Sequence, residues 1–139
     1  MSVEAFVDTN VLLYAASTSP DELAKRERAR ALLAGLSWGL SVQVLQELYV
    51  NLVRPGREVM SHDDAVVLVR QLLRRPLAVS DWELLLQALA LKQRFQRSYG
   101  DSAIVAAARG LGARILYTED LSHGQDYDGV RVENPFLNC

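Results

Sequence analysis

Four acidic residues occupy positions from which their carboxylates could act together on one substrate. Asp8 directly follows a short apolar segment, and Asp120 lies three residues beyond Tyr117, where another apolar segment ends. Glu47 lies about one turn into a predicted helix, and Asp101 lies in the first turn of another. Oxygen ligands of this kind, with no cysteine or histidine pair nearby, suit Mg²⁺ or Mn²⁺ better than Zn²⁺.

A hard dication bound by carboxylates has a characteristic chemistry at a phosphodiester. It lowers the pKa of a bound water to make a hydroxide nucleophile, and it neutralises charge that develops on the phosphate. Each acid alone also has a structural interpretation: a helix N-cap for Asp8 and Asp101, an exposed helix residue for Glu47, and an Asx turn for Asp120. Their joint placement favours the metal, because clustered carboxylates repel one another unless a cation neutralises them.

The elements that would position these acids can be predicted from apolar patterns and capping signals. Short apolar segments predict strands over residues 3–7, 38–42, 77–79, 114–117 and 130–132. Helices are predicted over residues 11–16, 19–35, 44–54, 61–73, 81–97 and 100–108. Three of these helices begin with a capping serine, namely Ser19, Ser61 and Ser80.

The alternation of strands with helices predicts a three-layer α/β/α sandwich with a mainly parallel central sheet. Ligands of such sheets bind beyond the carboxyl ends of the strands. Asp8 and Asp120 follow strands directly, and the helix that carries Asp101 begins at the same edge because it runs antiparallel to the strand it precedes. We therefore expect all four acids at one edge of the sheet.

Several polar residues near these acids have two interpretations each. Thr9, Asn10, Ser41 and Ser102 could orient the carboxylates or metal-bound waters, or they could be cap and turn residues. His123 lies three residues past Asp120 and is more typical of a structural loop histidine than of a ligand. Asp126 and Asp128 are interpreted as turn formers around Gly129.

Length and composition indicate one globular domain over residues 1–139, with a mass of 15.5 kDa. Half of the residues are apolar and 23% are charged, which excludes a disordered chain. The single cysteine, Cys139, cannot form an internal disulfide, and no apolar stretch approaches the length of a membrane span. Without a targeting segment, the expected location is the cytoplasm.

The net charge of −2 argues against binding nucleic acid through bulk positive charge. The basic residues, however, are 13 arginines and only two lysines, Lys25 and Lys92. Arginine binds phosphate in a planar, bidentate way, and a cation on four of the acids would leave the bases in excess. An RNA or DNA substrate is therefore compatible with the composition.

Five segments of the sequence resemble the PIN-domain ribonucleases, with the closest similarity to the VapC toxins of prokaryotic toxin-antitoxin pairs. The similarity extends over essentially the whole chain. The segments that carry it are VDTNVLLY (7–14), LSVQVLQELYVNLVRP (40–55), YGDSAIVAAA (99–108), LYTEDLSHG (116–124) and VENPF (132–136).

The resemblance implies a Mg²⁺- or Mn²⁺-dependent endoribonuclease whose cognate antitoxin blocks its active site. The family's acidic residues fall on Asp8, Glu47, Asp101 and Asp120, and the Thr-x-Asp spacing selects Asp120 rather than Glu119. The resemblance further implies an antitoxin tail that inserts a basic residue among these carboxylates. Apolar anchors for that tail are expected on the second to fourth helices, with candidates Leu32, Leu33 and Leu48.

A homodimer is expected from the apolar surface of two helices. The helix over 81–97 is apolar nearly all round in its first half, and the helix over 61–73 contains the apolar run 65–69. A helix that is apolar on every side must be buried on every side, which a small three-layer domain cannot provide alone.

Other function classes fit the residues less well. A phospho-acceptor signalling domain needs a lysine at the end of a later strand, whereas Lys25 and Lys92 both lie in predicted helices. A phosphatase with a nucleophilic aspartate needs a second aspartate two residues after Asp8, where Asn10 stands. A non-catalytic module that binds RNA or a partner would keep the fold but would not need all four acids.

Overall fold

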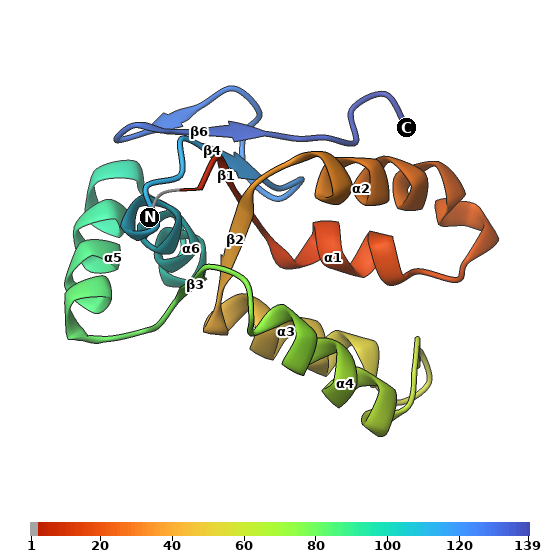
Figure 1. The fold of residues 1–139 in the computed structure, drawn as a ribbon. Coiled ribbons are helices and arrows are strands. Elements are labelled where there is room, and N and C mark those ends of the chain that lie inside the picture. The colour runs from red at the N-terminus through yellow and green to blue at the C-terminus, as the bar shows by residue number, and fades with distance from the viewer. Residues whose placement is uncertain (1–2) are drawn as a thin grey trace.

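The computed structural model describes residues 3–139 and contains a six-stranded sheet with helices on both faces (Figure 1). The order of strands across the sheet is β3-β2-β1-β4-β6-β5. The strands are β1 (Ala5–Val7), β2 (Trp38–Ser41), β3 (Leu77–Ala78), β4 (Ile115–Tyr117), β5 (Asp126–Tyr127) and β6 (Val130–Glu133). All neighbouring strands are parallel except β5 and β6, so the expected α/β/α sandwich with a mainly parallel sheet is confirmed.

The helices divide between the two faces of the sheet. Helices α5 and α6 lie on one side of β1 and β2, and α1 and α2 lie on the other (Figure 1), where α3 packs against α1 and α4 against α3. Their bounds are α1 (Thr9–Ala16), α2 (Leu23–Gly35), α3 (Val42–Leu52), α4 (His62–Leu72), α5 (Trp82–Phe95) and α6 (Tyr99–Gly110), with a short 3₁₀ helix over Pro20–Glu22. No helix within residues 3–139 is long and apolar enough to cross a membrane.

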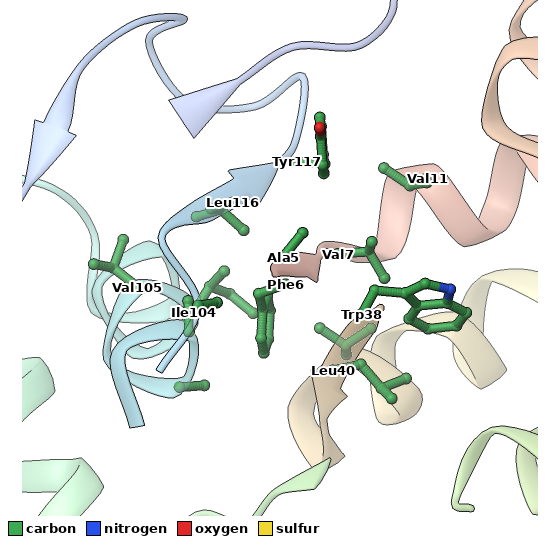
Figure 2. Close-up of a cluster of buried hydrophobic side chains, with 14 of the residues drawn as sticks. Ala5, Phe6, Val7, Val11, Trp38, Leu40, Ile104, Val105, Leu116 and Tyr117 are labelled. Carbon is green, nitrogen blue, oxygen red and sulfur yellow. The ribbon is translucent and has the colours of Figure 1, made fainter. Parts of the chain in front are cut away.

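The hydrophobic core lies between the sheet and the helices on each face. Phe6 of β1, Leu40 of β2 and Leu116 of β4 are fully buried, and the core continues into α6 through Ile104 and Val105 (Figure 2). Helix α6 is buried along seven consecutive residues, 102–108. Four of these seven are alanines, which let the helix lie close against the strands.

One of the three predicted capping serines is confirmed and two need correction. Ser61 caps α4 by accepting a hydrogen bond from the backbone N–H of Asp64. Helix α5 is capped by Asp81 rather than Ser80, since the Asp81 carboxylate accepts from the N–H of Leu84. Ser19 makes no capping hydrogen bond, because the chain first forms the 3₁₀ turn 20–22 and only then the helix.

Strand β5 was not expected from the sequence. Asp126 belongs to this strand, and its side chain accepts a hydrogen bond from the N–H of Gly129. Asp128 and Gly129 both have positive φ angles, of 54° and 97°, and they form the turn into β6. Their interpretation as turn formers is confirmed, and the turn adds one antiparallel strand to the edge of the sheet.

Candidate active site

The strand order places the candidate site at the ends of β1 and β4. These two strands are neighbours, and after them the chain continues toward opposite edges of the sheet. The chain builds β1, β2 and β3 outward on one side and then returns to place β4 against the other side of β1. Ligand sites of α/β sheets form at such switch points, beyond the carboxyl ends of the strands. Asp8 follows β1 and Thr118 to Asp120 follow β4, so both segments lie at this point.

Asp8 is the most buried of the four acids, with only 8% of its surface exposed. One carboxylate oxygen, Oδ1, accepts a hydrogen bond from the N–H of Thr9 at 2.8 Å and thereby caps α1. The other, Oδ2, accepts from the hydroxyl of Thr118 at 2.9 Å. The capping interpretation of Asp8 is therefore correct, and it is compatible with a place in the site because each oxygen keeps a further lone pair.

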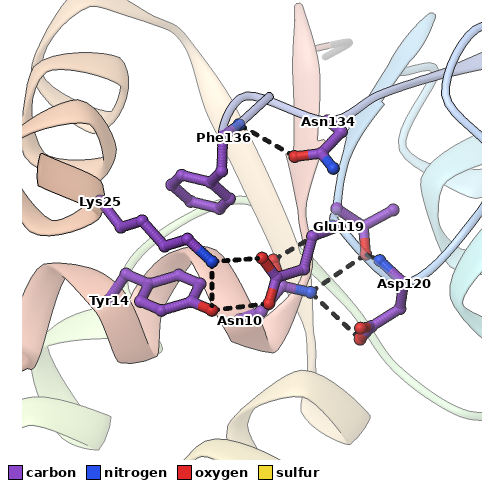
Figure 3. A network of polar contacts seen from close by, with 8 residues as sticks. Asn10, Tyr14, Lys25, Glu119, Asp120, Asn134 and Phe136 are labelled. Carbon is purple, nitrogen blue, oxygen red and sulfur yellow. Dashed lines mark hydrogen bonds and ion pairs between the residues drawn. The ribbon is translucent and has the colours of Figure 1, made fainter. Parts of the chain in front are cut away.

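Asp120 is joined to Asp8 through two polar side chains. The amide of Asn10 donates to the hydroxyl of Thr118 at 3.0 Å and to Oδ2 of Asp120 at 3.2 Å (Figure 3). The N–H of Asp120 also donates to the Thr118 hydroxyl. Asn10 and Thr118 thus hold the loop after β4 in register with the loop after β1.

Glu47 is joined to Asp8 from the opposite side. The hydroxyl of Thr9 donates to Oε2 of Glu47 at 3.0 Å, while the backbone N–H of Thr9 donates to Asp8. The Gln43 amide donates to Oε1 of Glu47 at 3.3 Å and to the carbonyl of Gly100 at 3.2 Å. This second bridge connects α3 to the first turn of α6, which carries Asp101.

Asp101 lies next to this network without a direct bond to the other acids. It is half-buried in the first turn of α6, whose N-cap is Ser98. The alternative in which Asp101 itself is the N-cap is therefore wrong. Among residues 3–139, no three acidic, histidine or cysteine side chains lie close enough to share a metal ion in this conformation.

The electrostatics of the site reflect a shortage of positive charge. Burial, with further contributions from the charges of Asp120 and Glu47, raises the pKa of Asp8 from 3.8 to about 6, although hydrogen bonds from Thr9 and Thr118 oppose the shift. Within the described chain no Lys, Arg or His forms an ion pair with any of the four acids. An all-oxygen donor set without a counter-charge fits a hard dication.

The four polar neighbours predicted from the sequence divide into two kinds. Thr9 and Asn10 hydrogen-bond directly to Glu47 and Asp120. Ser41 instead caps α3 through the N–H of Val44, and the Ser102 hydroxyl donates to the carbonyl of Ser98. Ser41 is therefore a helix cap, which is the alternative considered for it. Ser102 lies inside α6 and bonds back to the carbonyl four residues earlier, so it is not a cap.

Glu119 and His123 face away from the acids. Glu119 accepts from the Tyr14 hydroxyl at 2.7 Å and pairs with Lys25 at 3.4 Å (Figure 3). The ring of His123 accepts from the N–H of Asn134. The Thr-x-Asp spacing is consistent with this division, because the adjacent side chains of Glu119 and Asp120 make different contacts.

Sequence reasoning missed Thr118, Gln43 and the pair Tyr14 and Lys25. Thr118 had a usable signal, since it follows β4 as directly as Asp8 follows β1. Gln43 also had a local signal, because it lies one helical turn before Glu47 and donates to it, but its bond to Gly100 spans 57 residues. Lys25 had no local signal for its pairing with Glu119, which lies 94 residues away.

Two of the three expected apolar anchors are core residues. Leu32 is 6% exposed and Leu48 is fully buried, so neither can contact a partner. Both point into the core because they lie on the inner faces of α2 and α3. Leu33 does reach a surface hollow of about 190 Å³ between α1, α2 and α4, which also includes Ala16 and Leu72.

A family model described as PIN domain matches residues 5–125, which include all four acids. The chain belongs to the PIN-domain family. A search of curated protein sequences returned no significant match.

Solved structures with the same fold come from several toxin-antitoxin systems. A toxin-antitoxin complex from Klebsiella pneumoniae has a TM-score of 0.66 and 19% identity, covering 94% of this chain and 97% of that chain. VapC20 of Mycobacterium tuberculosis, described as a toxin that cleaves the sarcin-ricin loop, has a TM-score of 0.63 and 24% identity, covering 84% and 91%. VapBC2 of Rickettsia felis, bound to a DNA fragment from its promoter, has a TM-score of 0.65 and 18% identity, covering 94% and 97%.

These neighbours have the same PIN fold as this chain. The PIN domain described here therefore has its acidic residues at the switch point of a fold that several toxins share.

Proposed function

We propose that this PIN domain is a metal-dependent endoribonuclease and the toxin of a type II toxin-antitoxin pair. One observation carries the proposal: Asp8, Glu47 and Asp120 are joined by hydrogen bonds at the switch point, and no basic side chain of the described chain pairs with them. The solved toxins of the same fold support the biological role.

Asp8, Glu47, Asp101 and Asp120 would hold the metal ion, which we propose to be Mg²⁺ or Mn²⁺ because all their ligand atoms are oxygens. When bound, such an ion supplies a hydroxide nucleophile from water at neutral pH and stabilises negative charge on the phosphate. Burial and the charges of Asp120 and Glu47 raise the pKa of Asp8. Its carboxyl group would be ionised once a bound cation balances the charge.

The chain's own polar residues prepare this chemistry by fixing the carboxylates. The Thr118 hydroxyl donates a hydrogen bond to Asp8 Oδ2, so the lone pair that remains on that oxygen points in a set direction. Thr9 does the same for Glu47 Oε2, and Asn10 for Asp120 Oδ2. Carboxylates held in this way lose little further freedom when a ligand binds.

The test is cleavage of a structured RNA by Asp8→Asn, Asp101→Asn and Asp120→Asn. Each substitution keeps the shape of the side chain but removes a charge, so we expect kcat to fall by about 100-fold or more, because metal stabilisation of the transition state is worth several kcal/mol. Asp63→Asn, at an exposed position of α4, is the matched control and should cleave like the wild type. Circular dichroism checks that each variant is folded.

Chelation provides the second arm of this test. Cleavage should stop in excess EDTA and return when Mg²⁺ or Mn²⁺ is added. Wild-type turnover in the three variants, or activity that persists in EDTA, would refute the proposed reaction. RNA binding without cleavage by the wild type would instead assign the chain as a binding module.

A further inference from the structure

A cavity of about 350 Å³ lies directly beside the acidic residues. Its wall nearest the site is formed by Asn10 and Glu119, and Asn10 is the residue that donates to Asp120 (Figure 3). Its lining also includes Arg54 and Arg57, which lie beyond the C-terminus of α3. A ligand in the cavity would therefore extend from the carboxylates toward two guanidinium groups.

The chain brings these two arginines together through a tight turn. The N–H of Arg57 donates to the carbonyl of Arg54 at 3.0 Å, and Pro55-Gly56 occupy the two central positions. Gly56 has a φ of 81°, which type II turns require at that position and which glycine adopts without strain. The N–H of Val59 then donates back to Leu52, so the turn is fixed to the end of α3.

The arginines are near the acids along α3. Glu47 and the last helical residue, Leu52, are five residues apart, which corresponds to ~7.5 Å along the helix axis. Asn51, between them, also lines the cavity and donates to the carbonyl of Glu47 at 2.8 Å.

Both guanidinium groups are available to a ligand. Arg54 and Arg57 are exposed, and neither side chain forms a hydrogen bond or ion pair with another residue of the described range 3–139. The acids in the same cavity are already engaged. Glu119 pairs with Lys25 at 3.4 Å, and Glu22 accepts from the Ser17 hydroxyl at 2.6 Å.

We propose that this cavity is an RNA subsite in which Arg54 and Arg57 bind the backbone phosphate of a nucleotide next to the cleaved bond. Guanidinium groups bind phosphate through paired hydrogen bonds, and Leu13 and Val59 supply an apolar wall for the sugar or base. The volume falls within the range of about 300–1,000 Å³ typical of small-ligand sites. This inference rests on the proposed ribonuclease function, and it assigns RNA affinity and positioning to residues outside the acidic set.

The experiment measures RNA binding separately from cleavage. A short fluorescein-labelled single-stranded RNA is titrated with EDTA-treated protein by fluorescence anisotropy, from about 50 to 200 mM KCl. In the double variant Arg54→Gln/Arg57→Gln we expect Kd to rise about 10- to 100-fold. The slope of log Kd against log salt should become shallower by about 0.7, because the contact to one phosphate of a single strand is lost.

The matched control is Arg109→Gln/Arg114→Gln. These two exposed arginines lie at the end of α6 and before β4, at the opposite edge of the sheet, and the substitution removes the same charge. This control should keep wild-type affinity and salt dependence. In cleavage assays with Mn²⁺, the Arg54/Arg57 variant should raise KM and leave kcat within about twofold of the wild type.

Each alternative result has a definite meaning. Unchanged RNA affinity and salt slope in the Arg54/Arg57 variant would overturn the subsite, and unchanged RNA affinity with weakened antitoxin binding would assign the cavity to a protein instead. An inactive wild type that still binds RNA through Arg54 and Arg57 would overturn the proposed catalysis but support the subsite. The two proposals therefore fail in different measurements.

Discussion

Asp8 combines two requirements that conflict at the level of a single side chain. Its hydrogen bonds from the N–H of Thr9 and the hydroxyl of Thr118 favour the charged form, yet burial beside Asp120 and Glu47 disfavours that form. A carboxylate in this state stabilises the protein less when ionised than when protonated. The conflict is resolved when a cation binds, and it should be measurable in the protein without metal.

Asp8→Asn should therefore change how stability depends on pH. The folded-state pKa of Asp8 is raised from 3.8 to about 6, so the cost of ionising it is absent below pH 3.8, grows between these values and is complete above pH 6. The shift corresponds to about 3 kcal/mol. In EDTA, the free energy of unfolding of the wild type should fall by about this amount relative to Asp8→Asn as the pH rises to neutrality.

Urea unfolding of both proteins across this pH range is the measurement. Asp63→Asn serves as the control, because it makes the same change of side chain at an exposed position of α4. If Asp8→Asn ran parallel to the wild type, the raised pKa of Asp8 would be refuted. Groups common to both proteins cancel in the comparison.

At the level of elements, β2 joins the site to the edge of the sheet. Strand β2 ends at Ser41, and α3, which carries Glu47, begins at the next residue. Strand β3 pairs with β2 on the outer side of the sheet. The approach of β3 requires a glycine at position 39. A Cβ added to Gly39 would lie 2.8 Å from the carbonyl oxygen of Pro76 and 2.7 Å from a methyl carbon of Leu111.

Gly39→Ala should therefore destabilise the protein by about 1–3 kcal/mol, because overpacking forces backbone shifts between β2 and β3. Gly110→Ala is the matched control. A Cβ at Gly110 meets no atom within 4 Å, and alanine favours the helix, so this variant should be neutral or slightly more stable. Thermal unfolding of the two variants distinguishes them, and equal stabilities would contradict this account of the β2–β3 contact.

The whole molecule leaves a broad apolar surface on α5. This helix buries Ala88 and Leu91 against the domain, whereas the opposite face leaves Trp82 69% and Leu86 56% exposed. Leu85 and Leu89 are also exposed on the same helix. The expectation that the domain covers only one side of this helix is confirmed, and a homodimer remains our prediction.

Sedimentation should give a mass of about 31 kDa at micromolar concentration, twice the 15.5 kDa of one chain. The double variant Trp82→Glu/Leu86→Glu should sediment as a monomer, because two buried charges would oppose association. Leu23→Glu on α2, which replaces an apolar residue of similar exposure, should stay dimeric. A wild type that shows only 15.5 kDa would exclude the dimer.

Binding of a cognate antitoxin should compete with the metal ion. An arginine inserted among Asp8, Glu47 and Asp120 would replace the cation electrostatically and satisfy the carboxylates by bidentate hydrogen bonds. Calorimetric titration of the antitoxin should then show an affinity that weakens as Mn²⁺ is raised. Asp8→Asn should weaken it by about tenfold without metal, and an affinity that is flat in both respects would place the antitoxin elsewhere.

The sequence by itself determined the kinds of elements and the identity of the acidic edge. Helix starts such as Ser61 and the alternation of strands with helices are local signals, acting within one turn or one strand. The rule that parallel strands present their carboxyl ends at one edge then brought Asp8 and Asp120 together. The two-residue strand β5 escaped prediction because Asp126-Tyr127 is not part of an apolar segment, whereas the equally short β3 lies within the apolar segment 77–79.

Only the tertiary structure decided which strands are neighbours and which side chains pair. The position of β4 beside β1, the bonds of Thr118 and Gln43, and the diversion of Glu119 to Lys25 all join residues dozens of positions apart. The same packing buried Leu32 and Leu48 and left the α5 surface uncovered. Such contacts depend on how the layers close around one core, which local sequence signals do not encode.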